Sequence, residues 1–360
     1  MKKRVVVAMS GGVDSSVAAA LLKKKGFEVI GVTLCFNLPD LETKKPRCCG
    51  LQGIADARRV AHTLGIKHYV LNMQKALEER VIKDFCLEYT RGRTPNPCIR
   101  CNQYIKFGVL LKKAHALGAD YLATGHYARI VQARYPVRDT PEYLLKKAKD
   151  QHKDQSYFLY RLKQAQLKHI LFPLGGYTKE EVRVLARRFH LPVAEKKESQ
   201  EICFLPGTDY RSFLRSKITA GLRPGDIVDL KGNFLGRHKG IAFYTIGQRE
   251  GLGVALGYPA YVTKIDPKNH QITLGRKEEV LKSEFFVKNV HFLNPPGEKK
   301  FVLKVKIRYN HKEALTEIVQ QAKKLKVRFK KPQFAITPGQ SAVFYDRDRV
   351  VGGGIIDEVF

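Results

Sequence analysis

The fold is decided by one stretch near the start of the chain, Val5-Val6-Val7-Ala8-Met9-Ser10-Gly11-Gly12-Val13-Asp14-Ser15-Ser16. Its apolar first half predicts a buried strand, and the Ser/Gly turn that follows predicts the start of a helix. Small residues there leave backbone N–H groups pointing outward at the positive end of the helix dipole, which suits an anion. Gly11 and Gly12 are expected to adopt positive φ and to let a ligand come close, while the serine hydroxyls add donors. The stretch therefore predicts a phosphate site.

Two common nucleotide motifs are excluded by their spelling. A Walker A loop needs a lysine that this turn lacks, and the Gly-x-Gly-x-x-Gly dinucleotide fingerprint is also absent. The order Ser-Gly-Gly-x-Asp-Ser instead resembles the loop of the PP-loop ATP pyrophosphatases, which cleave ATP to AMP and pyrophosphate while adenylating an oxygen. The resemblance implies ATP and Mg²⁺ as cofactors, with Asp14 facing the metal. A plain Ser/Gly turn is the alternative, but it does not require the apolar run, the paired glycines and the acid in this order.

Composition favours a basic, multidomain protein. A chain of 360 residues suggests two or three domains. Lys and Arg number 65 against 34 Asp and Glu, which gives a net charge of +31 and makes nucleic acid the leading partner. A merely basic surface would give the same excess, so the charge has to be joined to more specific motifs.

The sequence also bears on compartment. No apolar run approaches the ~18 residues needed to span a bilayer, and the opening Met-Lys-Lys-Arg leads into a strand instead of a cleavable segment. We therefore expect a cytoplasmic protein with no membrane partner. The 7 cysteines are then expected to be reduced, metal-binding or catalytic. The last of them is Cys203, so the chemistry is expected in the first domain.

Strands and helices are expected to alternate through the first half of the chain, at residues 5–8, 17–25, 28–36, 54–64, 67–71, 107–117 and 120–124. This alternation implies right-handed crossovers and a parallel sheet covered on both faces. Ligands gather at the carboxyl ends of such strands, where residues 10–16, 34–37 and 125–127 would lie. Thr178-Lys179-Glu180-Glu181 reads as a capping box that opens a helix to about His190, with a purely structural role.

Beyond about Thr208 the pattern becomes β-rich. Residues 304–309 alternate strictly, so that Val305, Ile307 and Tyr309 share one face and the basic residues share the other. Residues 324–330 repeat this pattern. Basic outward residues either protect a sheet edge or face RNA, and the sequence leaves both interpretations open.

A second informative stretch is Gly92-Arg93-Thr94-Pro95-Asn96-Pro97-Cys98-Ile99-Arg100-Cys101-Asn102, which reads as a proline-stiffened loop with a Cys-x-x-Cys motif. Two thiols three residues apart can share a metal or form a redox pair. A zinc half-site completed by Cys48 and Cys49 is one alternative. A further thiol, Cys203, lies in a polar segment that could fold onto the same rim.

The chain as a whole resembles the tRNA-specific 2-thiouridylases. The matching motifs span nearly its whole length and lie at residues 10–15, 92–97, 101–102, 123–129, 153–158, 202–204, 244–249 and 338–342. The resemblance implies an α/β parallel-sheet PP-loop (adenine nucleotide alpha hydrolase-like) N-terminal domain, followed by two small β-rich domains, the last a β-barrel. The expected boundaries are 1–207, 208–277 and 278–360. The implied activity is ATP-dependent replacement of O2 of the wobble uridine, position 34 of tRNA, by sulfur.

The resemblance also implies a mechanism, in which ATP activates the uracil oxygen as an adenylate and sulfur then attacks C2. In the better-known form of the family, the cysteine matching Cys203 carries a persulfide and the one matching Cys101 is the nucleophile that releases it, leaving a disulfide. Surrounding cationic charge is expected to favour the thiolates. The sulfur donor is then a persulfide carrier.

One position departs from that form, because Cys98 stands where many members have an aspartate. Cys98, Cys101 and Cys203 could instead hold three irons of a [4Fe-4S] cluster whose fourth iron delivers hydrosulfide, and at the level of sequence we favour this cluster. Both routes use Cys101 and Cys203.

The remaining site residues are carried over from matching positions. The ATP-lining set is Ala8, Met9, Ser10, Gly11, Gly12, Val13, Asp14, Ser15, Leu34 and Gly125. The set facing the target base is Asn96, Pro97 and Cys98. The set contacting tRNA is His126, Lys153, Asp154, Gln155, Arg308, Tyr309 and Gln340, with a buried structural histidine as the alternative for His126.

Two other functions compete with thiolation. One is a PP-loop ligase that makes a small metabolite, which would not need the +31 charge or the basic β-rich tail. The other is a non-catalytic RNA-binding protein. The sequence leaves monomer and dimer equally open.

Overall fold

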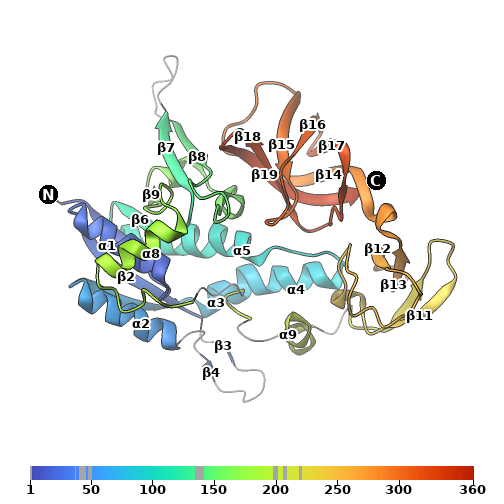
Figure 1. Cartoon of the computed structure of the whole chain (residues 1–360), viewed down its shortest axis with the longest axis horizontal. Helices are drawn as coiled ribbons and strands as arrows, with labels where there is room; N and C mark the ends of the chain where they lie inside the picture. Colours follow the sequence, from blue (N-terminus) through green and yellow to red (C-terminus); the bar gives the residue numbers. More distant parts are fainter. Residues whose placement is uncertain are drawn as a thin grey trace. The chain divides into compact units, whose positions relative to one another are not determined.

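The computed structural model describes residues 2–36, 38–39, 46–47, 51–133, 142–197, 202–205, 209–218 and 221–360. The chain divides into two compact units (Figure 1). The first, here called the sheet unit, comprises Met1–Val81, Cys98–Gly207 and Asp348–Val350. The second, here called the barrel unit, comprises Ile82–Pro97, Thr208–Arg347 and Val351–Phe360.

The sheet unit is built on a 5-stranded sheet in the order β5-β2-β1-β6-β9. The strands are β1 (Arg4–Ala8), β2 (Glu28–Cys35), β5 (Lys67–Asn72), β6 (Tyr121–Thr124) and β9 (Ile170–Leu171). Every neighbouring pair is parallel, as the alternation of strands and helices predicted. The chain builds outward from β1 first to one side and then to the other. The carboxyl end of β1 is therefore a topological switch point, where ligands bind in folds of this kind.

Helices cover both faces of this sheet. Val5 and Val7 pack into one apolar cluster with residues of α1 (Val13–Lys24), α2 (Leu51–Thr63) and α8 (Lys179–Arg188). Val6 points to the opposite face and is also fully buried. The helices of the sheet unit between β5 and β6 cross to that opposite face, as right-handed crossovers require once the strand order reverses. They are α3 (Gln74–Leu77), η1 (Glu78–Ile82), α5 (Pro97–Arg100), η2 (Cys101–Leu110) and α6 (Leu111–Ala116). Helix α4 (Lys83–Thr90) belongs to the barrel unit.

Two helix starts illustrate how local sequence sets the boundaries. Helix α1 begins at Val13, one turn earlier than predicted, because Gly12 takes an extended conformation and serves as its N-cap. The predicted capping box of α8 is confirmed. The Thr178 hydroxyl accepts from the Glu181 N–H at 3.2 Å, and the Glu181 carboxylate accepts from the Thr178 N–H at 2.6 Å.

A hairpin completes the sheet unit. Strands β7 (Arg129–Ala133) and β8 (Glu142–Lys146) pair antiparallel, and Lys146 pairs with Arg349. The Arg129 guanidinium lies 3.0 Å from the Asp348 carboxylate, which fixes residues 348–350 to this unit. The shorter elements here are η3 (Ser156–Leu159), α7 (Gln164–Leu167), β3 (Leu38–Pro39) and β4 (Pro46–Arg47).

The barrel unit contains a closed antiparallel barrel, as predicted. Its strands follow the order β14-β17-β16-β15-β18-β19, and β14 pairs with β19 to close it. They are β14 (Leu281–Phe292), β15 (Lys300–Lys306), β16 (Ala314–Gln321), β17 (Lys324–Phe334), β18 (Ser341–Asp346) and β19 (Arg349–Val359). Phe285, Val305, Val327 and Phe344 lie in its apolar interior.

The rest of the barrel unit is also β-rich. A 4-stranded sheet has the order β11-β10-β13-β12. Its strands are β10 (Gly225–Val228), β11 (Phe234–His238), β12 (Tyr261–Asp266) and β13 (Gln271–Gly275). Three short helices accompany it: α9 (Tyr210–Lys217), η4 (Ile241–Phe243) and η5 (Lys277–Val280). Across the described ranges, no helix combines the length and apolar character that a membrane crossing needs.

The basic alternating segments are not sheet edges. Leu325, Val327 and Phe329 are buried as the alternation predicted. However, β15 and β17 each pair with a strand on both sides, so the edge-protection interpretation is wrong. Barrel closure leaves no free edge there. Lys326 and Arg328 on β17 pair with the Glu284 carboxylate on β14, which ties part of the basic face to the barrel itself.

Candidate nucleotide and sulfur site

The loop between β1 and α1 has the form that a phosphate site requires. Gly11 has a φ of 73°, and a Cβ at this position would lie 2.1 Å from the Gly53 carbonyl oxygen, so only glycine fits. Gly12 does not adopt the positive φ that we expected, since its φ is −96° as the N-cap of α1. The Ser15 and Ser16 hydroxyls donate to the Gly12 carbonyl at 3.1 and 2.8 Å, so they shape the loop and do not point outward as expected.

Asp14, the acid of this loop, is paired with a lysine from α8. The Lys179 ammonium donates to Asp14 Oδ1 at 2.7 Å, and the Tyr127 hydroxyl donates to the same oxygen at 2.8 Å. The Lys179 side chain is only 11% exposed. The sequence interpretation missed Lys179 because it was counted as part of a capping box. A cation in the first turn of a helix is opposed by the dipole, and that mismatch was the available signal.

A second lysine reaches the loop from the other side. The Lys196 ammonium donates to the Gly11 carbonyl at 3.0 Å and to the Asp56 carboxylate at 2.5 Å. Asp56 is buried on α2 and also accepts from Gln52 and Arg59. Burial alone would raise the pKa of Asp56, but these donors outweigh it and hold the pKa below its ordinary value. Lys196 therefore couples a buried carboxylate to the backbone of the phosphate loop.

The other residues of the ATP-lining set lie at the same edge of the sheet. Residues 8–15 run from the end of β1 into α1. Gly125 follows β6 and packs against the loop so closely that a Cβ there would lie 2.7 Å from the Ser15 nitrogen. Leu34 lies near the carboxyl end of β2, two residues past the partner of Ala8. The structure thus brings this set together around the switch point.

The Cys-x-x-Cys motif lies on a helix and not in the loop that we expected. Cys98 is in α5 and Cys101 begins the π-helix η2. Their spacing puts both side chains toward one face of the helical run. Cys98 is half-buried, Cys101 is buried and Cys203 is exposed. All three are free thiols, as is the buried Cys86.

The three thiols interact with one another electrostatically. Burial raises the pKa of Cys98 to about 11, Cys203 adds to this rise, and Lys106 opposes it. Burial raises the pKa of Cys101 to about 12, with Lys106 lowering it and Cys203 and Cys98 raising it. Lys106 thus favours both thiolates, as expected of a neighbouring cation, but burial has the larger effect on each pKa. Lys106 is the cation that these thiols share.

The metal sites expected at the cysteines are not formed by the described residues. Among the residues that the structure describes, no three His, Cys, Asp or Glu side chains are placed to hold one metal ion. Cys35 is disulfide-bonded, contrary to the expectation of reduced cysteines. Cys48 and Cys49, the alternative zinc ligands, lie outside the described residues, as does Asn37.

His126 is buried and anchored on both ring nitrogens. Its Nδ1 lies 2.7 Å from the Thr124 hydroxyl and its Nε2 lies 3.5 Å from the Lys106 ammonium. Burial and then Lys106 hold the pKa of His126 well below its ordinary value, so the ring is neutral near pH 7. The ring also lies beside Phe107 and Phe172, with centroid distances of 5.9 Å to each.

In the neighbouring set 153–155, Asp154 and Gln155 make hydrogen bonds to other parts of the chain. The Asp154 carboxylate accepts from the Ala148 N–H at 3.0 Å and from the Ser156 hydroxyl at 2.7 Å. The Gln155 side chain accepts from the Tyr127 N–H at 3.0 Å. Lys153 is half-buried. These contacts place residues 153–155 against the segment that follows β6.

One of the candidates in the barrel unit, Gln340, contacts the segment that precedes Cys98. The Gln340 amide donates to the Thr94 carbonyl at 3.0 Å, and the Thr94 N–H donates to the Pro338 carbonyl at 2.9 Å. Arg308 donates to the Phe334 carbonyl at 2.9 Å. Arg308 and Tyr309 lie beyond the end of β15, so the strand alternation predicted for residues 304–309 stops at Lys306. Pro97, at the first position of α5, suits a helix start, and Asn96 precedes it.

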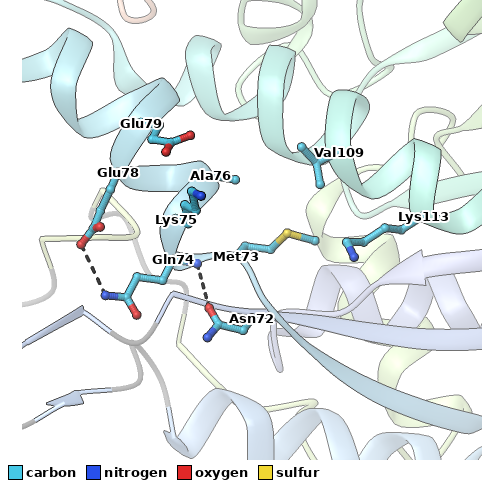
Figure 2. A pocket seen from close by; sticks show the side chains of 9 residues that line it. All are labelled: Asn72, Met73, Gln74, Lys75, Ala76, Glu78, Glu79, Val109 and Lys113. Carbon is cyan, nitrogen blue, oxygen red and sulfur yellow. Dashed lines mark hydrogen bonds between the residues drawn. The ribbon is translucent and has the colours of Figure 1, made fainter.

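A separate cavity of about 490 Å³ lies beyond the carboxyl end of β5. Figure 2 shows Asn72, Gln74 and Glu78 on one side and Val109 and Lys113 on the other. Gln74 is held within this wall, because its N–H donates to the Asn72 side chain at 2.9 Å and its amide to Glu78 at 3.4 Å. No residue of the phosphate loop and no cysteine lines this cavity.

A parallel sheet with a Ser-Gly-Gly-x-Asp-Ser loop at its switch point, and two lysines upon that loop, defines a nucleotide-binding protein of the PP-loop class. Three family models match the chain. Residues 3–207 match the model described as "tRNA methyl transferase HUP domain". Residues 211–276 match "tRNA methyl transferase PRC-barrel domain", and residues 282–356 match "Aminomethyltransferase beta-barrel domain".

Two relatives name the family more closely. The chain is 53% identical over 363 residues to "tRNA-specific 2-thiouridylase MnmA 1" of Caldanaerobacter subterraneus subsp. tengcongensis, covering 99% of each protein. It is 49% identical over 362 residues to "tRNA-specific 2-thiouridylase MnmA" of Carboxydothermus hydrogenoformans, covering 99% of this chain and 98% of the relative. The chain belongs to the tRNA-specific 2-thiouridylases, a family of tRNA sulfurtransferases. The model descriptions mention methyl transfer, but the relatives cover the whole chain at high identity and decide the family.

A solved structure with a related description is more distant. The crystal structure of a 4-thiouridine synthetase–RNA complex with bound ATP is 18% identical, with a TM-score of 0.34, and the match covers 56% of this chain and 45% of that one.

Proposed function

We propose that this enzyme replaces O2 of the wobble uridine, position 34 of tRNA, with sulfur in an ATP-dependent reaction. The observation that carries the proposal is the presence, in one compact unit, of the Ser-Gly-Gly-x-Asp-Ser loop and of three free thiols, Cys98, Cys101 and Cys203. Thiolation needs both parts. Oxygen bound to carbon leaves poorly, whereas the same oxygen leaves readily once AMP is attached to it.

The nucleotide step uses the loop between β1 and α1. Its backbone N–H groups and the dipole of α1 would bind phosphate oxygens. Asp14 is half-exposed and would hold Mg²⁺, which in nucleotide sites is bound by one or two carboxylates together with phosphates. The donor set at Asp14 fits such a metal, which would offset the phosphate charge. Lys179 would then move from Asp14 to the phosphates.

The sulfur step uses Cys203 and Cys101. The terminal sulfur of a Cys203 persulfide attacks C2, and the C2–O bond breaks so that the oxygen leaves with AMP. The Cys101 thiolate then attacks the Cys203 sulfur, which releases 2-thiouridine and leaves a Cys101–Cys203 disulfide. A thiol reductant restores both thiols with two electrons. The exposure of Cys203 suits sulfur delivery by a carrier, and the burial of Cys101 keeps it from other reactants.

The [4Fe-4S] alternative fits the described positions less well. Cys98, Cys101 and Cys203 lie within electrostatic range, but they do not form a set placed to hold a metal ion within the described part of the chain. We therefore route no step through a cluster. The donor in this proposal is a persulfide carrier, with hydrosulfide as the donor that the cluster route would use instead.

The remaining assignments follow from the family. Asn96, Pro97 and Cys98 would face the target base, and Lys153, Arg308 and the basic barrel surface would contact tRNA phosphates. We retain the division into domains at 1–207, 208–277 and 278–360 and a cytoplasmic location as parts of the proposal.

The proposal is tested by measuring AMP release from purified protein, ATP, Mg²⁺ and a persulfide donor in the presence of different tRNA transcripts. A transcript with uridine at position 34 should stimulate AMP release, and a matched transcript with cytidine there should not. Stimulation by a small metabolite instead of tRNA would identify a ligase. No AMP with any RNA would identify a non-catalytic RNA-binding protein.

A further inference from the structure

The π-helical winding of η2 gives Lys106 its place. Lys106 follows Cys101 by five residues in a helix whose hydrogen bonds run from i to i+5. In an α-helix the two side chains would be turned about 140° apart. The wider turn brings Lys106 round toward the side that carries Cys101. A ten-residue π-helix is unusual in length, and such segments are frequent at functional sites.

His126 fixes the Lys106 ammonium. Nε2 of His126 lies 3.5 Å from Lys106 Nζ, and Nδ1 lies 2.7 Å from the Thr124 hydroxyl. Lysine can only donate, so Nε2 accepts, and the ring proton is on Nδ1, from which it donates to Thr124. The ring is 9% exposed and lies between aromatic neighbours, so it has little freedom to turn. His126 therefore anchors the Lys106 ammonium through Nε2 while Thr124 fixes the other side of the ring.

The charge of Lys106 is felt by both thiols of the Cys-x-x-Cys motif. It opposes the effect of burial at Cys98 and at Cys101. Cys98, Cys101 and Lys106 belong to one continuous helical run, α5 followed by η2, so the winding of that run sets where the three side chains leave the backbone.

We propose that Lys106, held by His126, is a positioning residue that supplies the positive potential at the Cys98–Cys101 face and retains anionic sulfur there. The ligand is a persulfide or hydrosulfide anion. This assignment rests on the proposed sulfur-transfer function and deepens it. It also gives His126 a role that acts through Lys106, separate from the tRNA contact that the resemblance implied.

Alkylation of the resting protein tests the potential directly, without ATP or tRNA. Iodoacetate and iodoacetamide are close in size and attack thiolates in the same way, but only iodoacetate is anionic. At each of Cys98 and Cys101, the rate with iodoacetate is divided by the rate with iodoacetamide, both measured by peptide mass spectrometry. Solvent access and the fraction of thiolate affect both rates equally, so the ratio reports the local charge.

We expect Lys106→Met and Lys106→Gln to lower this ratio about three- to tenfold, and Lys106→Arg to preserve it. His126→Phe should lower it partly, since the ammonium loses its anchor. Lys112→Met is the matched control, because Lys112 is exposed on α6. Thermal melts of each variant show that the labelled protein is folded.

An unchanged ratio in folded Lys106→Gln would overturn the assignment. The outcome is separable from the proposed function. If Lys106→Gln lowers the ratio but the unchanged protein never thiolates tRNA, the proposed function is wrong and the assignment of Lys106 stands. If the ratio is unchanged and the protein does thiolate tRNA, the assignment of Lys106 is wrong and the proposed function stands.

Discussion

The Lys179 ammonium lies 2.7 Å from Asp14 Oδ1, although the two residues are separated by 165 positions in the chain. The one carboxylate of the phosphate loop is thus held by a cation that would itself suit a phosphate. This ion pair keeps the Lys179 ammonium next to the loop before a nucleotide binds.

Lys179→Met should reduce tRNA-dependent AMP formation by about ten- to a hundredfold, because a partly buried phosphate contact is lost. Steady-state kinetics at varied ATP measures the effect. Lys149→Met is the control. The Lys149 ammonium lies 2.7 Å from the carboxylate of Glu181, which is on the same helix as Lys179, and this ion pair is at the exposed surface. Equal ATP kinetics in Lys179→Met and in the unchanged protein would contradict the role of Lys179.

Gly11→Ala should abolish nucleotide binding, because the new Cβ would collide with the Gly53 carbonyl oxygen and φ is 73°. Gly26→Ala is the matched control. Its φ is 84°, yet nothing lies within 4 Å of the added Cβ. It should cost about 1 kcal/mol of unfolding free energy through backbone strain and leave ATP binding intact. Calorimetric titration with ATP separates the two, and full binding by Gly11→Ala would refute this account of the loop.

Asp56→Asn should lower the unfolding free energy by about 1–3 kcal/mol at pH 7, since the buried acceptor of Lys196 loses its charge. The pKa of Asp56 is depressed in the folded protein, so its stabilisation is present above the ordinary value of 3.8 and is lost as pH falls through the folded value. Urea unfolding of both proteins from pH 7 down to pH 3 should therefore show the difference shrinking. A difference that stays constant with pH would show that the charge of Asp56 plays no part.

Gln340→Leu should destabilise the barrel unit by about 1–2 kcal/mol, because its amide holds the Thr94 carbonyl. Gln321→Leu is the control, since Gln321 is exposed at the end of β16. Urea unfolding and the KM for tRNA are measured together. A raised KM with unchanged stability would show that Gln340 acts by contacting RNA.

Cys101→Ser and Cys203→Ser should each abolish thiolation while retaining tRNA-dependent AMP formation, because adenylation precedes sulfur attack. Cys98→Ser should keep part of the thiolation, since Cys98 has no step in the persulfide route. Iron analysis of anaerobically purified protein accompanies the assay. About four irons per chain, lost together with activity in Cys98→Ser, would establish the cluster route instead.

The sequence predicted what depends on local pattern. The parallel sheet follows from alternating apolar strands and helices, and the phosphate loop from two glycines before a helix. It also predicted the capping box of α8, whose two hydrogen bonds join residues only three positions apart. The domain boundaries stay a prediction.

What the sequence could not predict depends on packing between distant segments. Lys179 and Lys196 reach the loop from positions far along the chain, so the sequence of the loop itself does not reveal these contacts. The raised pKa values of Cys98 and Cys101 come from burial, which spacing alone does not reveal. The π-helical winding that turns Lys106 toward Cys101 is equally invisible in the order of the residues.

The central claim is that ATP activates the C2 oxygen of the target uridine. A tRNA carrying ¹⁸O at O2 of uridine 34 tests it most directly. With ATP, Mg²⁺ and a persulfide donor, the account predicts one ¹⁸O atom in the AMP for each 2-thiouridine formed, read by mass spectrometry. Unlabelled AMP alongside 2-thiouridine, or sulfur incorporation without AMP, would contradict it.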